Sequence, residues 1–254
     1  MFMMLLFSFN LGSLPYFDLL SGKLLPGLSG MCFILFASGL YGGLVLAPAE
    51  YQQGDSFRII YIHVPAVWMS MIIYMVMAGW AAVGLIWNVK LAEMMAGALA
   101  PTGAIFTVIG LWTGALWGRP TWGAYWVWDA RLTTYLIMLF LYMGYIALRS
   151  AIDDPRRASK ASALLAIVGG INVPIIYFSV KWWNTLHQPF TVAPGQESKI
   201  DPTMLWTMLI MTIAFWAYTL AVSLIRVRCD ILEREKNSSW VAELLQGPST
   251  EGKQ

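Results

Sequence analysis

The chain of 254 residues is 58% hydrophobic and only 12% charged, whereas soluble domains carry about 25% charged residues. This composition excludes an ordinary soluble domain and predicts an integral membrane protein. The formal net charge of +2 is too small to indicate a nucleic-acid-binding protein.

The first 27 residues begin with an apolar run that Asp18 and Lys23 interrupt before it is long enough to span a bilayer. The run also lacks the basic region and the small-residue cleavage site that mark a signal peptide. We expect residues 1–27 to form an amphipathic segment at the membrane interface.

Six apolar stretches follow, and each is long enough to cross a hydrocarbon core of roughly 30 Å as a helix. They cover residues 28–48, 64–87, 94–117, 132–148, 161–180 and 203–225, and none of them contains Asp, Glu, Lys or Arg. We therefore predict an all-α membrane domain of six transmembrane helices over residues 28–228, followed by a tail at 229–254. Asn172, close to Gly169, Gly170 and Pro174, predicts a structural kink in the fifth stretch.

The basic residues predict the orientation of these helices, because cytoplasmic connections carry an excess of Lys and Arg. Eleven of the sixteen basic residues belong to one set of connections: Lys23, Lys90, Arg149, Arg156, Arg157, Lys160, Arg226, Arg228, Arg234, Lys236 and Lys253. The other set holds Arg58, Arg119, Arg131, Lys181 and Lys199. Both termini and the tail are therefore expected in the cytoplasm. The connections at 49–63, 117–131 and 181–202 are expected to face outward.

The second outward connection lies within the sequence WGRPTWGAYWVWDARLT, which covers residues 117–133. It contains four tryptophans within twelve positions, at 117, 122, 126 and 128. An interfacial aromatic belt needs one or two such residues at each helix end, so this density exceeds that of a belt. Both histidines of the chain, His63 and His187, also fall in outward connections or at their edges.

A flat apolar ligand with a central metal and acidic groups on one edge could bind to the tryptophans, the two histidines and the arginines of the outward connections. Indole rings stack on its faces, two imidazoles bind the metal, and arginines pair with its acids. Haem fits this description, with His63 and His187 as axial ligands and with Arg58 and Arg131 as candidate propionate contacts. Other roles remain open: Arg58 as an interfacial arginine, and Asp129 as a helix cap or as the partner of Arg131 in an exposed pair.

The tryptophan-rich sequence closely resembles the "WWD" signature of haem-handling proteins of cytochrome c maturation. With its six spans, its length and one outward histidine on either side of the signature, the chain is similar to the CcmC family, haem exporter protein C of the system I pathway. The resemblance implies that His63 and His187 are the external ligands of haem b iron. It also implies that seven residues form the haem platform and chaperone contact: Trp117, Gly118, Trp122, Gly123, Trp126, Trp128 and Asp129.

The resemblance further implies a set of partners. Haem would be delivered on the periplasmic side to a membrane-anchored haem chaperone (CcmE-like). The chain would act beside ABC transporter subunits (CcmA/CcmB-like) and a small single-span protein (CcmD-like). It would be a haem transfer protein rather than a conventional enzyme, although haem-lyase-like assistance stays open.

Two other functional classes are alternatives to this one. An ion-coupled small-molecule transporter places ionisable groups inside its spans, and the six predicted spans contain no acidic or basic residue. A b-type cytochrome or quinol-linked membrane subunit would hold haem with histidines inside its spans, whereas both histidines here lie at the outer edge. An ATPase is excluded because the sequence contains no phosphate-binding G-x-x-x-x-G-K-[ST] loop.

Overall fold

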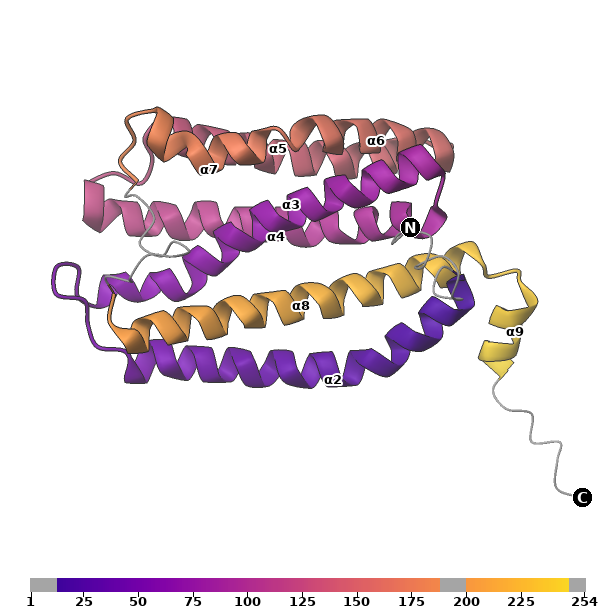
Figure 1. Cartoon of the computed structure of the whole chain (residues 1–254), viewed down its shortest axis with the longest axis horizontal. Helices are drawn as coiled ribbons and strands as arrows, with labels where there is room; N and C mark the ends of the chain where they lie inside the picture. Colours follow the sequence, from indigo (N-terminus) through magenta and orange to yellow (C-terminus); the bar gives the residue numbers. More distant parts are fainter. Residues whose placement is uncertain (1–12, 188–199, 247–254) are drawn as a thin grey trace, which may run out of the picture.

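The computed structural model describes residues 13–187 and 200–246, and the described chain folds into a bundle of long helices that lie side by side (Figure 1). The helices are α2 (Leu14–Tyr41), α3 (Ile60–Trp87), α4 (Lys90–Trp122), α5 (Ala130–Ala151), α6 (Pro155–Gly169), α7 (Asn172–Trp182), α8 (Pro202–Arg234) and α9 (Ser239–Gln246). A π-helical turn, η2 (Gly42–Leu46), ends α2, and a 3₁₀ turn, η3 (Asp55–Ile59), leads into α3.

Six helical segments in the described chain are long and apolar enough to cross a membrane. They are Leu14–Leu46, Asp55–Trp87, Lys90–Trp122, Ala130–Ala151, Pro155–Trp182 and Pro202–Arg234. This result confirms the predicted all-helical fold and the predicted number of apolar spans. Each segment begins before its predicted first residue, and the last four also end after their predicted last residue, because helices continue past the apolar run. The first segment ends at Leu46, two residues before its predicted end.

Helix α2 shows how such an extension is stabilised. It begins at Leu14, so the predicted boundary between an interfacial segment and the first span, at residue 27, falls inside one continuous helix. Asp18 is buried within it and pairs with Arg228 of α8, whose Nε lies 2.8 Å from Asp18 Oδ1. A paired carboxylate is tolerated where a lone one would not be. The first twelve residues of the predicted segment lie outside the described residues.

Glycines on α4 allow tyrosines of α5 to reach the centre of the bundle. Gly103 faces the ring of Tyr142, and Gly110 faces the hydroxyl of Tyr135. Tyr142 donates a hydrogen bond to the carbonyl of Ser70 at 2.6 Å, and the Tyr135 hydroxyl lies 2.8 Å from Ser70 Oγ. These buried hydrogen bonds fasten α5 to α3. Helix α3 also packs extensively on α4, as α2 does on α8.

The fifth span is broken between α6 and α7, as the sequence predicts. Gly169 lies at the end of α6, where a Cβ atom would overlap with the hydroxyl of Tyr74. Asn172 begins α7 and donates from Nδ2 to the carbonyl of Thr134 at 2.9 Å. The asparagine therefore satisfies a carbonyl of α5 and fixes α7 beside it, which is a structural role.

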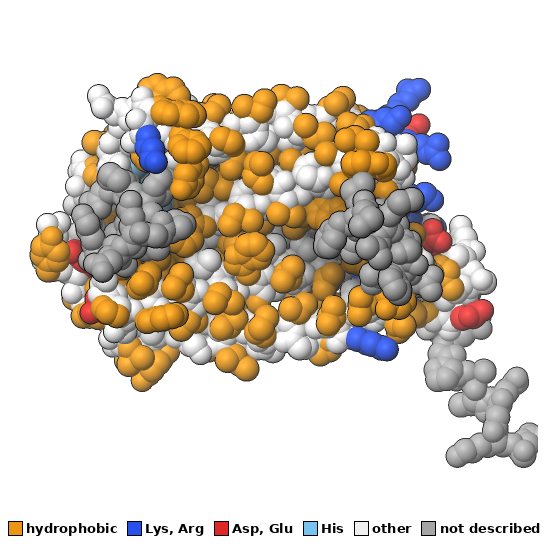
Figure 2. Space-filling view, in the orientation of Figure 1, with side chains coloured by type: hydrophobic (Ala, Val, Ile, Leu, Met, Phe, Trp, Pro, Cys, Tyr) orange, Lys and Arg blue, Asp and Glu red, His pale blue; other side chains and the backbone are white. Residues whose placement is uncertain are grey.

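The two ends of the bundle differ in charge. Lysine and arginine side chains gather at the end that carries α9 and the α3–α4 and α5–α6 connections (Figures 1 and 2). The opposite end carries the α2–α3, α4–α5 and α7–α8 connections. This separation agrees with the sorting expected from the sequence. The side of the membrane on which each end lies stays a prediction.

Candidate functional site

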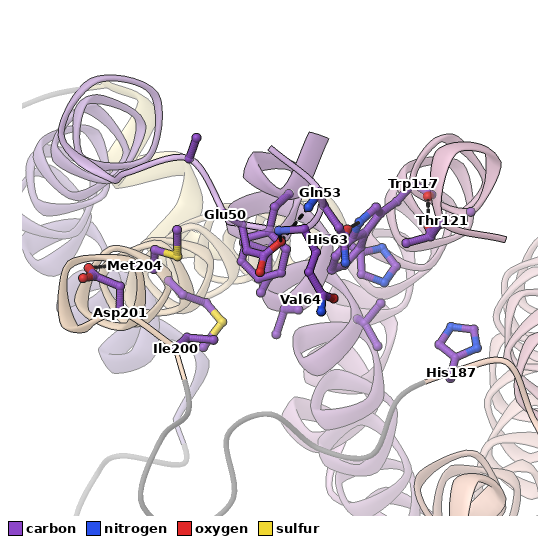
Figure 3. Close-up of a pocket in the computed structure, with 18 of the residues that line it drawn as sticks. Glu50, Gln53, His63, Val64, Trp117, Thr121, His187, Ile200, Asp201 and Met204 are labelled. Carbon is purple, nitrogen blue, oxygen red and sulfur yellow. Dashed lines mark hydrogen bonds between the residues drawn. The ribbon is translucent and has the colours of Figure 1, made fainter. Parts of the chain in front are cut away.

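A cavity of about 550 Å³ opens at the end of the bundle that carries the tryptophan-rich connection. It is lined by both histidines, by Arg131 and by residues of the α2–α3 connection, α3, α4 and the start of α8 (Figure 3). The lining residues on α4 are Gly114, Trp117, Gly118, Thr121 and Trp122, and those at or just before the start of α8 are Ile200, Asp201, Met204 and Met208. The structure thus brings two distant histidines to one space.

His63 lies in the first turn of α3, two residues before Pro65, which lies inside the helix rather than at its first position. Its Nδ1 lies 2.9 Å from Oγ1 of Thr113 on α4. The ring of Trp117 meets the imidazole edge to face, with centroids 5.6 Å apart and planes at 80°. A hydrogen bond and an aromatic contact therefore hold this imidazole against α4.

His187 reaches the same cavity from the chain that follows α7. Its imidazole packs against Trp122 at the end of α4, with ring centroids 4.9 Å apart. Nδ1 of His187 lies 3.8 Å from Oδ2 of Asp129, a separation at which opposite charges attract but longer than a hydrogen bond. In Figure 3 this imidazole lies apart from that of His63, so the two histidines contribute from different walls.

Asp129 connects the start of α5 to the His187 segment. Its Oδ1 accepts a hydrogen bond from the backbone N–H of Leu132 at 2.8 Å, which confirms the predicted helix cap. Its Oδ2 accepts from the N–H of Leu186 at 3.3 Å. Burial alone would raise the pKa of Asp129, but His187 and these two N–H donors together lower it. The carboxylate stays ionised and can attract the imidazole of His187.

The connection predicted at residues 117–131 starts later than residue 117. Helix α4 continues to Trp122, and Gly123, with φ +79°, ends it in the left-handed conformation that favours glycine. Pro120 lies inside α4, two residues before its end, and it costs the helix one hydrogen bond because its nitrogen carries no hydrogen. Trp117 and Trp122 are consequently carried on a rigid helix, and the non-helical part of the signature begins at Gly123.

The four tryptophans of the signature take different positions. Trp117 and Trp122 line the large cavity, and Trp117 Nε1 donates to Gln53 Oε1 at 2.6 Å. Trp126 lines a neighbouring cavity of about 50 Å³, where its Nε1 is buried and has no hydrogen-bond partner among the described residues. Trp128 packs edge to face on Trp126 but is 78% exposed. Two indoles therefore wall the large cavity, and one faces outward.

The structure separates the two candidate arginines. Arg131 lines both cavities, together with His63 and His187. Arg58 lines neither of these two cavities; it pairs with Asp55 at 2.8 Å and donates to the carbonyls of Ala47, at 3.0 Å, and of Gly43. The geometry therefore places Arg131 in the site and gives Arg58 a structural role in fastening η3 to the end of α2.

Three residues at the site do not belong to any motif that sequence analysis would detect. Thr113 contacts His63, Gly114 lies beside the same ring, and Gln53 binds the indole of Trp117. Thr113 and Gly114 precede Trp117 by about one helical turn and so share its face of α4. Their spacing from Trp117 could therefore have been used to predict that they lie at the site. Nothing in the local sequence indicates a role for Gln53.

A family model described as "CcmC: Heme exporter protein C" matches residues 7–242. The chain belongs to the heme exporter protein C family. The Heme exporter protein C of Escherichia coli (strain K12) is 46% identical over 224 residues, which are 88% of this chain and 90% of that protein. The proteins of the same description from Bradyrhizobium diazoefficiens and Haemophilus influenzae are 48% identical over 219 residues and 43% identical over 225 residues. These alignments cover 86% and 89% of this chain, and 83% and 92% of the two relatives.

Membership of the heme exporter protein C family confirms the resemblance that the tryptophan-rich signature and the two histidines indicate. The match covers the six apolar spans, the tryptophan-rich signature and both histidines. The family name does not identify the residues that bind a ligand, so that assignment depends on the geometry described above.

Proposed function

We propose that this protein binds haem b as its cargo in the 550 Å³ cavity and passes it to a haem chaperone during cytochrome c maturation. His63 and His187 are the axial ligands of the iron. The observation that carries this proposal is that the two histidines, from α3 and from the segment after α7, line one aromatic cavity. Each also has a polar partner near Nδ1, which leaves Nε2 available to a metal.

The cavity suits the shape and polarity of haem. Trp117 and Trp122 supply flat apolar walls, and Val64, Val67 and Met208 add further apolar side chains to the lining. The relatives are named heme exporter proteins, which supports haem over another aromatic ligand. Haem supplies an iron with two open axial positions, and the protein supplies the imidazoles and the platform.

The charges of the lining suggest an orientation for the cargo. Glu50 and Asp201 line the large cavity at positions that Figure 3 shows away from His187, and they would repel the carboxylates of haem. Arg131 lies close to both histidines and offers the opposite charge. We place the propionates at Arg131 and the hydrocarbon edge of the porphyrin toward the other lining residues.

Delivery requires the loaded cavity to be accessible to another protein. Trp128, which is 78% exposed, packs on Trp126 at the edge of the site and offers an apolar contact next to the cargo. We assign the outward, periplasmic side to this end of the bundle and a membrane-anchored CcmE-like chaperone to this contact. CcmA/CcmB-like transporter subunits and a CcmD-like single-span protein complete the proposed assembly in the inner membrane.

The ligand assignment is tested by spectroscopy of the purified protein. Because the chain has only two histidines, a histidine-free affinity tag leaves no other imidazole. Wild type should show the absorption spectrum of low-spin bis-imidazole haem. His63→Ala and His187→Ala should each lose that spectrum, and added imidazole should restore it. Undiminished haem with an unchanged spectrum in both variants would show that these residues are not the ligands.

Delivery is tested separately. Haem-loaded wild type, mixed with a purified CcmE-like chaperone, should lose its bis-imidazole spectrum as the chaperone gains haem. Trp128→Ala should bind haem like wild type and transfer it more slowly. Equal transfer rates would remove Trp128 from the chaperone contact without affecting the ligand assignment.

A further inference from the structure

We infer that Thr113 is a positioning residue for His63: its hydroxyl selects the tautomer of the imidazole and turns Nε2 toward the cargo metal. The inference deepens the proposed function, on which it rests, by adding a residue that lies outside both the tryptophan-rich signature and the histidine pair.

The hydroxyl of Thr113 has one proton, and its neighbours determine where that proton goes. Oγ1 lies 2.6 Å from the carbonyl oxygen of Ile109, one turn earlier on α4. A carbonyl can only accept, so the hydroxyl donates there. The contact of 2.9 Å between Oγ1 and His63 Nδ1 must then be donated by the imidazole. Nδ1 therefore carries the hydrogen of the neutral ring.

This tautomer is the one that a metal site needs. When Nδ1 of a neutral imidazole is protonated, Nε2 keeps its lone pair and can bind a metal. A hydrogen bond from Nδ1–H also fixes the orientation of the ring and increases its basicity as a ligand. Thr113 thus has the function that a backbone carbonyl or a carboxylate performs in other histidine sites.

The rest of this helix face prevents the ring from turning away. Trp117, four residues after Thr113, packs edge to face on the imidazole. Gly114 lies so close that a Cβ atom at its position would be 3.0 Å from Cε1 of His63. The hydroxyl of Thr113, the backbone of Gly114 and the indole of Trp117 lie on one face of α4. Together they surround the imidazole of His63 on α3.

The chain offers a matched control for the hydroxyl. Thr107 is a buried threonine on α4, and its Oγ1 donates to the carbonyl of Gly103 at 2.7 Å, within its own helix. Thr113→Val and Thr107→Val each replace a hydroxyl by a methyl group of similar size. They differ in that only Thr113 contacts an imidazole through this oxygen. Thr113→Ser restores the hydroxyl at the site.

The experiment compares these variants after loading with haem. In Thr113→Val we expect release of haem to apomyoglobin to be roughly 10- to 100-fold faster, the effect typical of losing such a partner. We also expect a higher midpoint potential of the bound haem, because a less basic imidazole stabilises ferric iron less. The electron paramagnetic resonance spectrum of the ferric form should change as well. Thr113→Ser and Thr107→Val should match wild type. If Thr113→Val and Thr107→Val behave alike in all three measurements, the inference is wrong.

A second measurement needs no cargo. With ¹⁵N-labelled histidine, the haem-free protein contains two imidazoles, and His187→Gln identifies the signals of His63. The chemical shifts should show protonated Nδ1 and unprotonated Nε2. The opposite tautomer would overturn the role of Thr113 even if haem binds as proposed. Loss of haem ligation with the expected tautomer would instead contradict the proposed function.

Discussion

The carboxylate of Asp129 and the imidazole of His187 lie 3.8 Å apart, although three helices separate them along the chain. Asp129 is the last of the seven signature residues named above and caps α5, while its other oxygen accepts from the N–H of Leu186. The signature therefore does more than provide indole rings, because its aspartate fixes the segment that carries the second histidine.

Replacing Asp129 by Asn should separate these two tasks. Asparagine caps helices about as well as aspartate, so thermal stability should change little, whereas Asp129→Ala should lose roughly 1 kcal/mol through the missing cap. Both variants lose the charge beside His187, and haem release should accelerate by roughly tenfold in each. Thermal unfolding and haem transfer to apomyoglobin measure the two effects. Unchanged haem release in both variants would leave Asp129 with the capping role alone.

The two arginines should respond differently to the acid groups of the cargo. If Arg131 pairs with a propionate, wild type should bind haem dimethyl ester, which has no free carboxylate, more weakly than haem. Arg131→Gln should bind both porphyrins with the same reduced affinity, because the charge that distinguishes them is gone. Arg58→Gln should preserve the preference of wild type, since Arg58 is bound to Asp55 and to backbone carbonyls. A preserved preference in Arg131→Gln would place the propionates elsewhere.

The orientation in the membrane can be tested with cysteine labelling. Tyr51 is 88% exposed on the α2–α3 connection, and Cys229 is exposed near the end of α8, toward the other end of the bundle. With intact spheroplasts, an impermeant maleimide should label Tyr51→Cys and should label Cys229 only after the membrane is opened. The reverse pattern would place the cavity on the cytoplasmic side.

The six spans were predictable because hydropathy averages over about 20 residues and tolerates local irregularity. The ends of the helices were not, because they depend on contacts made across the bundle. Asp18 by itself argues against a membrane helix, and only the fold brings Arg228 of α8 beside it. Pro120 likewise suggests a break where the helix continues.

Some residues of the site could likewise be predicted from the sequence, whereas others depend on contacts that only the fold creates. The signature and the histidine pair were readable because they are rare residues in a dense or sorted pattern. Arg58 and Arg131 looked equivalent in the sequence, although Asp55, three residues before Arg58, already offered it a local partner. The role of Thr113 depends on the crossing of α3 and α4, which brings residues 50 positions apart into contact. No local pattern encodes that crossing.

The pair of Asp18 and Arg228 should stabilise the protein more than an exposed pair does. Asp18 is buried, and its side chain is 3% exposed, so Arg228→Ala would leave an uncompensated buried charge. We expect a loss of roughly 3 kcal/mol, which Asp18→Asn in the same chain should partly recover. Arg234→Ala, which breaks the more exposed pair with Asp230, should cost about 0–1 kcal/mol. Thermal unfolding in detergent provides the comparison, and equal losses in both alanine variants would contradict the structural role of the buried pair.

The packing of α4 against α5 predicts a contrast between two glycines. A Cβ atom at Gly103 would overlap with the ring of Tyr142, which is fully buried and fastened to the Ser70 carbonyl at 2.6 Å. The ring cannot move aside without breaking that hydrogen bond, so Gly103→Ala should destabilise by roughly 1–3 kcal/mol. A Cβ atom at Gly79, in the middle of α3, would meet no described residue outside its own helix within 4 Å. Gly79→Ala should therefore be neutral or stabilise by up to about 1 kcal/mol, because alanine favours the helix. If both alanines shifted the unfolding temperature in the same direction, close packing of α4 on Tyr142 would not be what holds α5 in place.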